Sequence, residues 1–387
     1  MGKLCMVLPP FSPDYSGVCS SMFGFGFRGI TVIHDAAGCT GNYTGYDEPR
    51  WYHSRSPVYC SGLREIDAIL GDDEKFVDKI LLAVEEIKPE LIALVGSPVP
   101  MVIGTDMEGI AADIENRTGI PTFGFSTSGL EYYTDGIQQV HQKVVWKILE
   151  ERKENTKKEK RRVNILGATP LDFGKGEAIE DMRCLLEEKG YEVNIALWKD
   201  CSIAQVESLP ESACNIVVSG SGLWLAEQMK KKYEIPYIMG IPFGTAYQKR
   251  WLARLEQLLE KGEVEEENTF AEKTAEMLII GEQVQSDSLR KAFGETYGIK
   301  ADIGAVCGFH KEIAKEEDLF LETEAEIEEA LNCEKYKIIV GDPVYQGLLH
   351  EKKEFIPYAH YALSSKVGVE WEYSLIGEKF EKRIKIK

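Results

Sequence analysis

Strand-like and helix-like patterns alternate along almost the whole of this 387-residue chain. The short apolar runs GITVIHD, LIALVGS and PTFGFST have the length and composition of strands that are buried on both faces. Between them, DEKFVDKILLAVEEI has apolar residues three and four positions apart, as in an amphipathic helix. Because such alternation is typical of parallel sheets whose strands are connected by helices, we predict an α/β fold built from doubly wound, Rossmann-like domains.

Two highly charged stretches interrupt this alternation and suggest domain boundaries. They are EERKENTKKEKRR at 150–162 and EKGEVEEEN at 260–268. Charge runs of this kind are usually solvated linkers or helix ends. We therefore predict three doubly wound domains with parallel sheets, at residues 1–155, 156–265 and 266–387.

Composition excludes several classes of protein. The formal net charge is −19, whereas nucleic-acid binding needs Lys and Arg to neutralise phosphates, so we expect no nucleic acid as a partner. No run of about eighteen apolar residues is present, and the N-terminus lacks a signal-peptide pattern. We expect a cytoplasmic protein that does not span a membrane. Nine cysteines, an odd number, argue for reduced thiols rather than a disulfide framework.

The common nucleotide-binding motifs are missing. The chain has no G-x-x-x-x-G-K-[ST] motif, and FGFGFRG does not match the G-x-G-x-x-G pattern that opens a helix. If the protein carries out a redox reaction, its electrons and energy must therefore come from another protein.

Three cysteines in the first domain are candidates for a metal site. Cys19, Cys39 and Cys60 are 20 and 21 positions apart, and none belongs to a C-x-x-C pair, which weakens the case for a zinc ribbon. Cys39 follows a strand and precedes a Gly/Tyr-rich loop without a helical pattern, where doubly wound sheets place ligands. Sulfurs of an iron–sulfur cluster would accept hydrogen bonds from the backbone of such a loop.

The residues leave other interpretations of these cysteines open. Cys19 and Cys60 could be small buried apolar residues, as free cysteines usually are, or the same thiols could bind zinc. Cys184, within a helical pattern, is expected in the core.

The stretch CSSMFGFGFRGITVIHDAAGCTGNY resembles the first segment of nitrogenase component 1 subunits. In that family a cysteine precedes a loop, a strand and a His-Gly-x-x-Gly-Cys turn, which here is His34 to Cys39. The downstream segment CSGLREIDAILGDDEKF and the segments NIVVSGSGLWLAEQMKKKYEIPYIMGIPFG and IIVGDPVYQGLL extend the resemblance over most of the chain.

The resemblance implies an iron–sulfur cluster held by Cys19 and Cys39. Ser97 stands where the family has a third cysteine, and we infer that Cys60 takes over this role, because thiolate is a better iron ligand than a hydroxyl. His34 either donates to the cluster or pins the turn; His53 could substitute as a ligand, although a surface position is the simpler interpretation. Because cubane clusters have four ligands, the fourth would come from a second subunit, either identical or a sister chain.

The resemblance also has limits that bear on function. The region Val218 to Ser221 lacks the cysteine that anchors the large cofactor of nitrogenase, so we do not expect dinitrogen reduction. We expect a nitrogenase-like oxidoreductase subunit with a [4Fe–4S] or larger cluster, working as a dimer. It would receive electrons from a separate ATP-dependent iron protein and reduce a small-molecule substrate. The alternative is a scaffold that assembles or carries a metallocluster.

Overall fold

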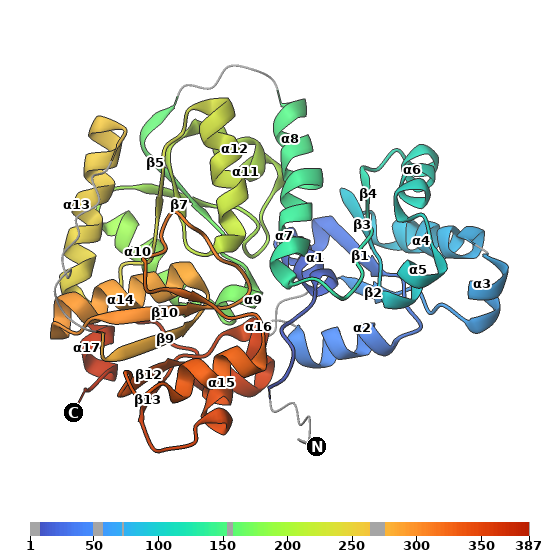
Figure 1. The fold of residues 1–387 in the computed structure, drawn as a ribbon. Helices are drawn as coiled ribbons and strands as arrows, with labels where there is room; N and C mark the ends of the chain where they lie inside the picture. Colours follow the sequence, from blue (N-terminus) through green and yellow to red (C-terminus); the bar gives the residue numbers. More distant parts are fainter. Residues whose placement is uncertain (1–7, 49–56, 72, 153–157, 264–274, 387) are drawn as a thin grey trace.

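The computed structural model describes residues 8–48, 57–71, 73–152, 158–263 and 275–386. These residues form three β-sheets whose strands are all parallel, each surrounded by helices (Figure 1). The predicted α/β class with doubly wound parallel sheets is confirmed. Of the helices formed by the described residues, none has the length and apolar composition needed to cross a membrane.

The three candidate cysteines lie on the first sheet or on helices next to it. Its spatial order is β2 (Val58–Cys60), β1 (Gly29–Ile33), β3 (Leu91–Val95) and β4 (Thr122–Phe125). Its helices are α1 (Asp14–Phe23), α2 (Gly38–Asn42), α3 (Glu65–Leu70), α4 (Asp73–Ile87), α5 (Pro98–Ile103), α6 (Met107–Thr118), α7 (Tyr133–Val140) and α8 (Trp146–Glu151).

Alternating side chains of the first sheet enter two different cores, which is the reason its strands are apolar throughout. Ile30 and Leu94 belong to the core that α4 and α6 cover. Ile33 and Val95 belong to the larger core on the other face, which α1 and α7 cover.

The second sheet repeats the strand order of the first. Its spatial order is β6 (Glu192–Ile195), β5 (Glu159–Leu166), β7 (Ser212–Val217) and β8 (Tyr237–Met239). Its helices are α9 (Pro170–Phe173), α10 (Glu177–Glu188), α11 (Ile203–Glu207), α12 (Leu223–Tyr233) and α13 (Thr245–Lys261).

The third sheet has one strand more, in the order typical of a Rossmann half. Its spatial order is β11 (Leu319–Phe320), β10 (Ala301–Ala305), β9 (Met277–Gly281), β12 (Ile338–Gly341) and β13 (Glu354–Pro357). Its helices are α14 (Gln283–Tyr297), α15 (Glu324–Asn332), α16 (Tyr361–Ser364) and α17 (Lys379–Arg383).

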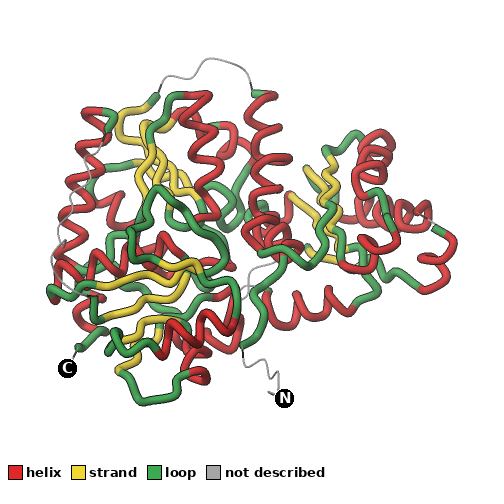
Figure 2. Tube along the Cα trace, in the orientation of Figure 1, coloured by secondary structure: helices red, strands yellow, loops and turns green. Residues whose placement is uncertain are grey.

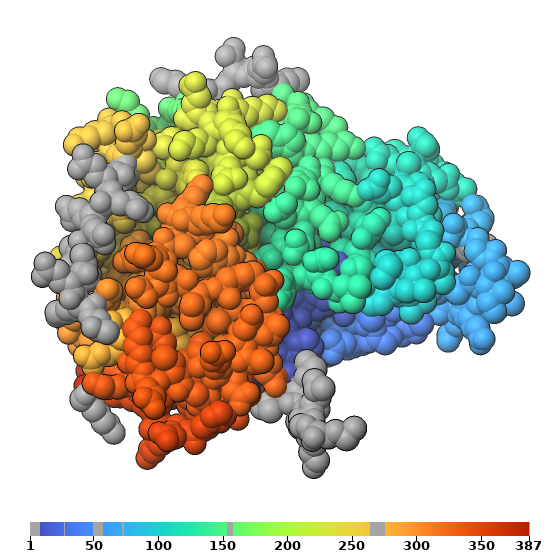
Figure 3. All heavy atoms as spheres, viewed as in Figure 1, coloured from blue at the N-terminus to red at the C-terminus, as the bar shows by residue number. Residues whose placement is uncertain are grey.

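The three sheets fall within the three predicted domain ranges. The predicted boundaries near residues 155 and 265 lie outside the described residues and stay a prediction. The part of the chain from β1 to β4, blue to teal, projects from the side of the body that the later residues form (Figure 3), whereas α7 and α8 lie between the two (Figure 1).

Two glycines let α1 and α7 pack backbone to backbone, which connects the first sheet to the rest of the molecule. A Cβ on Gly17 would overlap the carbonyl oxygen of Tyr133, and a Cβ on Gly136 would overlap that of Asp14. Only hydrogen fits at these two positions, so the sequence permits a close helix crossing here.

Candidate functional site

The switch point of the first sheet lies between β1 and β3, because the chain runs from β1 to β2 on one side and then crosses to β3 on the other. In open α/β sheets, ligands bind at the carboxyl ends of the strands at such a point. His34 and Asp35 follow β1, and Ser97 follows β3. The Ser97 hydroxyl donates to the His34 carbonyl at 2.9 Å and to the Asp35 carboxylate at 3.1 Å, so it joins the two loops.

Asp35 organises the turn that contains Cys39. Its carboxylate is buried and accepts hydrogen bonds from the backbone N–H groups of Ala37 at 2.9 Å and Thr40 at 3.0 Å. The segment after it is helical: α2 is followed directly by a π-helix at Tyr43–Asp47 (Figure 2). The expectation of a non-helical loop after Cys39 was therefore wrong. The segment is helical because the Asp35 side chain accepts hydrogen bonds from its first backbone N–H groups, as the side chain of an N-terminal cap does.

Cys39 is half-buried in the first turn of α2. Burial and the neighbouring Asp35 carboxylate raise the pKa of its thiol, while a hydrogen bond with the Tyr15 side chain opposes that rise. Tyr15 is on α1, so this contact connects α1 to the Cys39 turn.

Cys60, at the end of β2, lies against the same aspartate. Its thiol donates to the Asp35 carbonyl oxygen at 3.4 Å and accepts from the Gly62 N–H at 3.3 Å. It is half-buried, like Cys39. Asp35 thus contacts Cys60 through its carbonyl group and the helical turn of Cys39 through its carboxylate.

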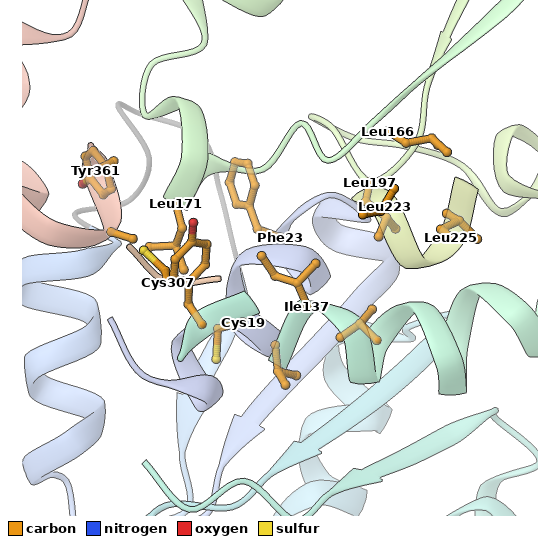
Figure 4. Packing of buried hydrophobic residues seen from close by; sticks show 14 of the residues in the cluster. Cys19, Phe23, Ile137, Leu166, Leu171, Leu197, Leu223, Leu225, Cys307 and Tyr361 are labelled. Carbon is orange, nitrogen blue, oxygen red and sulfur yellow. The ribbon is translucent and has the colours of Figure 1, made fainter. Parts of the chain in front are cut away.

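Cys19 has the buried position of the second interpretation that the sequence left open. It is on the interior of α1 rather than in a loop, is fully buried, and belongs to the large apolar core (Figure 4). Burial and the nearby Glu48 and Asp47 carboxylates raise the pKa of its thiol well above the ordinary value.

The predicted convergence of Cys19, Cys39 and Cys60 on one cluster stays a prediction, although Cys19 and Cys39 both lie close to Tyr15. Over the described residues, no group of three or more His, Cys, Asp or Glu side chains lies close enough together to hold a metal ion. The donor set fits a thiolate-bound cluster in part: Cys39 and Cys60 are two half-buried thiols at one sheet edge. The alternative ligand His53 lies outside the described residues.

His34 is held as a neutral, structural side chain. Its Nδ1 lies 2.9 Å from the Ser61 hydroxyl, and its ring stacks on Phe76 with centroids 4.2 Å apart. Burial and the nearby Lys79 lower its pKa to about 4. These contacts favour the interpretation in which His34 pins the turn.

A second polar centre, which the sequence analysis missed, lies where the three sheets meet. The buried Asp172 of α9 accepts from Tyr133 of α7 at 2.8 Å, from Thr169 at 2.7 Å and from Ser221 at 2.9 Å. His360, before α16, lies 3.2 Å from the Tyr133 hydroxyl. We call each sheet with its helices a unit. The Asp172 carboxylate thus connects all three units, because Tyr133 belongs to the first, Ser221 to the second and His360, 3.8 Å away, to the third.

Glu282, before α14, faces this centre and joins the switch points of the second and third sheets. Its carboxylate accepts from the N–H groups of Gly220 at 2.9 Å, Val284 at 3.1 Å and Gln285 at 2.9 Å. Burial and the Asp172 charge nevertheless raise its pKa to about 7. An acidic residue within two positions of the end of an apolar strand was the available signal for both Asp35 and Glu282.

The other cysteines of the described residues divide by exposure. Cys201, Cys214 and Cys307 are buried, whereas Cys184 and Cys333 are exposed. The expected core position of Cys184 was wrong, because α10 turns this residue toward solvent.

Fold and site together define a doubly wound α/β protein with two thiols at the carboxyl ends of neighbouring strands of its first sheet. Residues 17–287 match the family described as nitrogenase component 1 type oxidoreductase. Since this match covers well over half of the chain, the chain belongs to that family, and the resemblance inferred from its first cysteine segment is confirmed.

Two kinds of curated relative share this sequence. The chain is 25% identical over 211 residues to one subunit of the light-independent protochlorophyllide reductase of Leptolyngbya boryana, covering 53% of this chain and 42% of that protein. It is 26% identical over 233 residues to the nitrogenase iron–molybdenum cofactor biosynthesis protein NifE of Clostridium pasteurianum, covering 59% and 49%. The alignments thus span less than half the length of these relatives.

The fold is shared over the whole chain. The solved structure described as nitrogenase Cp1 at pH 6.5 superposes with a TM-score of 0.69, covering 99% of this chain and 92% of that chain at 13% identity. At that identity the likeness concerns the fold alone.

Proposed function

We propose that the protein is a nitrogenase-like component 1 subunit that holds an iron–sulfur cluster at the switch point of its first sheet. It would receive electrons from a separate ATP-dependent iron protein and pass them to a small-molecule substrate other than dinitrogen. The observation that carries the proposal is the placement of Cys39 and Cys60, two half-buried thiols that both adjoin Asp35.

A symmetric pair of subunits would complete the ligand set. Two copies of Cys39 and Cys60 supply four thiolates, the number that a cubane cluster takes. Cys19, the third ligand expected from the sequence, is buried in the core against which Cys39 packs, and both thiols lie close to Tyr15. A sister component 1 chain could take the place of the second copy.

The α5 helix supports a subunit interface next to this site. It begins directly after Ser97, and Val99, Met101, Val102 and Ile103 are all exposed on it, Val102 to 76%. Exposed apolar groups of this kind are typical of protein–protein contact surfaces.

When bound, the cluster supplies one-electron transfer. The residues of this chain set its surroundings: Asp35 fixes the turn of Cys39, and Ser97 joins that turn to β3. Burial and hydrogen bonds around the sulfurs tune the reduction potential of such a cluster.

The test is the metal content of anaerobically purified protein. We expect about four iron and four sulfide per dimer and an electron paramagnetic resonance signal after reduction. Cys39→Ser and Cys60→Ser should each lose most of the iron, whereas Cys333→Ser, at an exposed position, should keep it. A colourless protein that contains zinc instead of iron would overturn the proposal.

The second candidate function is a scaffold for metallocluster assembly, which the similarity to NifE favours. The two functions differ in what the cluster-loaded protein does with a reductase and ATP. Turnover of a small molecule supports the enzyme, whereas release of the cluster to an acceptor protein supports the scaffold.

A further inference from the structure

The side chain of Tyr15 lies next to two of the candidate ligands. Tyr15 and Cys19 are one turn apart on the same face of α1, since they are four positions apart in a helix. The Tyr15 hydroxyl is hydrogen-bonded to Cys39 of α2, and Cys19 is near enough to act on Tyr15 electrostatically. One phenol therefore connects α1, which carries Cys19, to the turn that carries Cys39.

The fold holds the ring of Tyr15 in one place. The side chain is buried within the large core against which Cys39 packs. Gly129, which follows β4 and has a φ of 76°, leaves the space for the ring, because a Cβ there would lie only 3.3 Å from the Cε1 atom of Tyr15. The loop after β4 thus packs directly against the ring, and the first sheet determines where the hydroxyl lies.

Asp47 is the competing acceptor for this hydroxyl, and other donors already bind it. Its carboxylate is near enough to Tyr15 to act on the phenol electrostatically. The Ser16 hydroxyl donates to one carboxylate oxygen at 2.8 Å, and the Ser365 hydroxyl donates to the other at 3.2 Å. Asp47 thus has two donors of its own, and the hydrogen bond of Tyr15 goes to the Cys39 sulfur.

In this contact Tyr15 is the donor. Burial above all, followed by the charges of Cys39 and Asp47, raises the pKa of Tyr15 above its ordinary value, so the hydroxyl keeps its proton. A thiolate has no proton to donate and accepts the phenol O–H, and a hydrogen bond to a charged acceptor is stronger than one between neutral groups. The contact is therefore strongest when Cys39 is a thiolate, which is the form that binds metal.

Tyr15 and Asp35 hold different parts of the same cysteine turn. The Asp35 carboxylate accepts from the backbone N–H groups of Ala37 and Thr40, which lie on either side of Cys39. Tyr15 contacts the Cys39 side chain itself. Because rotation about χ1 is the only freedom between the backbone of a cysteine and its sulfur, the two contacts together fix the direction of the Cys39 sulfur.

We propose that Tyr15 is a positioning residue of the cluster site: its hydroxyl donates to the Cys39 sulfur, fixes the direction of that sulfur and raises the reduction potential of the cluster. Hydrogen bonds to the sulfurs are among the factors that set the potential of iron–sulfur clusters. A donor favours the reduced cluster, because that form carries more negative charge. The inference rests on the proposed function in taking Cys39 as a ligand.

Tyr15→Phe tests the inference, because it removes the hydroxyl and keeps the ring. We expect the equilibrium between oxidised and reduced cluster to shift about tenfold toward the oxidised form, which lowers the potential by about 59 mV for one electron. A redox titration followed by electron paramagnetic resonance measures this shift. The iron content should stay within about twofold of the wild type, because the thiols of Cys39 and Cys60 remain.

Tyr336→Phe is the matched control. Tyr336 and Tyr15 are each 5% exposed, and the Tyr336 hydroxyl also donates to a charged acceptor, the Asp302 carboxylate, at 3.0 Å. Tyr336 lies between α15 and β12 in the third unit. If the Tyr15 hydrogen bond were merely structural, both variants would lose stability and keep the potential. An unchanged potential in Tyr15→Phe, or an equal shift in Tyr336→Phe, would overturn the inference.

Hydrogen–deuterium exchange of the metal-free protein tests the positioning without the cluster. In Tyr15→Phe the backbone N–H groups of α2 should exchange about threefold faster than in the wild type, because the turn has lost one of its two contacts. Tyr336→Phe should leave this exchange unchanged. Equal exchange of α2 in Tyr15→Phe and the wild type would show that the hydroxyl does not hold the turn and would contradict the inference.

Iron and sulfide analysis of the same samples separates this inference from the proposed function. A wild type that contains its cluster, together with a Tyr15→Phe variant unchanged in potential and exchange, would contradict the inference alone. A wild type without iron would contradict the proposed function, and the exchange measurement would still decide whether Tyr15 holds the cysteine turn.

Discussion

At the scale of single residues, Asp35 is the position on which the candidate site most depends. Its carboxylate accepts from two backbone N–H groups and from the Ser97 hydroxyl, and its carbonyl accepts from Cys60. It also holds Ala37 in the left-handed region at a φ of 98°, a conformation that costs an alanine about 1 kcal/mol or more.

Removing the Asp35 carboxylate should destabilise the protein and disturb the cysteine turn. We expect Asp35→Ala to lower the free energy of unfolding by about 2–4 kcal/mol, because the buried donors of Thr40 and Ser97 and the part-buried N–H of Ala37 lose their acceptor. Urea denaturation measures this change. The exposed Asp78→Ala should stay within about 0.5 kcal/mol of the wild type. An equally small effect at Asp35 would show that these hydrogen bonds do not organise the turn.

Cys19, unlike Cys39 and Cys60, has the surroundings of a core residue. Cys19→Ser should cost about 1–2 kcal/mol, because it places a hydroxyl in an apolar core, and should leave the iron content unchanged. Thermal unfolding and iron analysis on the same preparation measure both effects. Loss of iron with unchanged stability would make Cys19 a ligand after all.

At the scale of elements, the contact between α1 and α7 determines how the first sheet is attached. α1 carries Tyr15, which contacts Cys39, and α7 carries Tyr133, which bonds Asp172 in the second unit. The glycines at 17 and 136 allow the two helices to approach each other closely. A shift of either helix would therefore affect both polar centres.

Gly136→Ala tests this element directly. Its methyl group would overlap the backbone of Asp14, so we expect a loss of about 3 kcal/mol in stability. Gly41→Ala is the matched control: Gly41 is helical, nothing lies within 4 Å of a Cβ there, and the change should gain up to about 1 kcal/mol. If the two variants had the same stability, the close crossing of α1 and α7 would not be needed.

At the scale of the whole molecule, the polar ends of the three sheets meet around Asp172 and Glu282. Tyr133 comes from the first unit, Asp172 from the second, and Glu282 and His360 from the third. Two buried carboxylates at one junction repel each other, which is the second cause, after burial, of the raised pKa of Glu282.

This junction should make stability depend on pH in a definite direction. Because the pKa of Glu282 rises from 4.5 in the unfolded chain to about 7, the folded protein binds the extra proton between these values. The stabilisation is complete below pH 4.5 and is lost as the pH rises through 7. Relative to Glu282→Gln, the free energy of unfolding of the wild type should fall by up to about 1.4 kcal/mol for each pH unit between pH 4.5 and pH 7.

Urea unfolding of both proteins at several pH values measures this difference. His34 and His141, whose pKa values are lowered to about 4, act in the opposite direction but are common to both proteins. Parallel stability curves for the two proteins would exclude Glu282 as the titrating group.

The sequence by itself determined the order and type of the elements, since β1, β3, β4, α4 and α6 follow from apolar patterns within single segments. It also placed Cys39 at a strand end and indicated the family. Only the tertiary structure decided that the Cys39 turn is helical, that Cys19 faces the core, and which carboxylates meet at the junction. Local patterns act over a few neighbouring residues, whereas contacts such as that of Ser97 with Asp35 join residues far apart in the chain and exist only once the helices and sheets have packed.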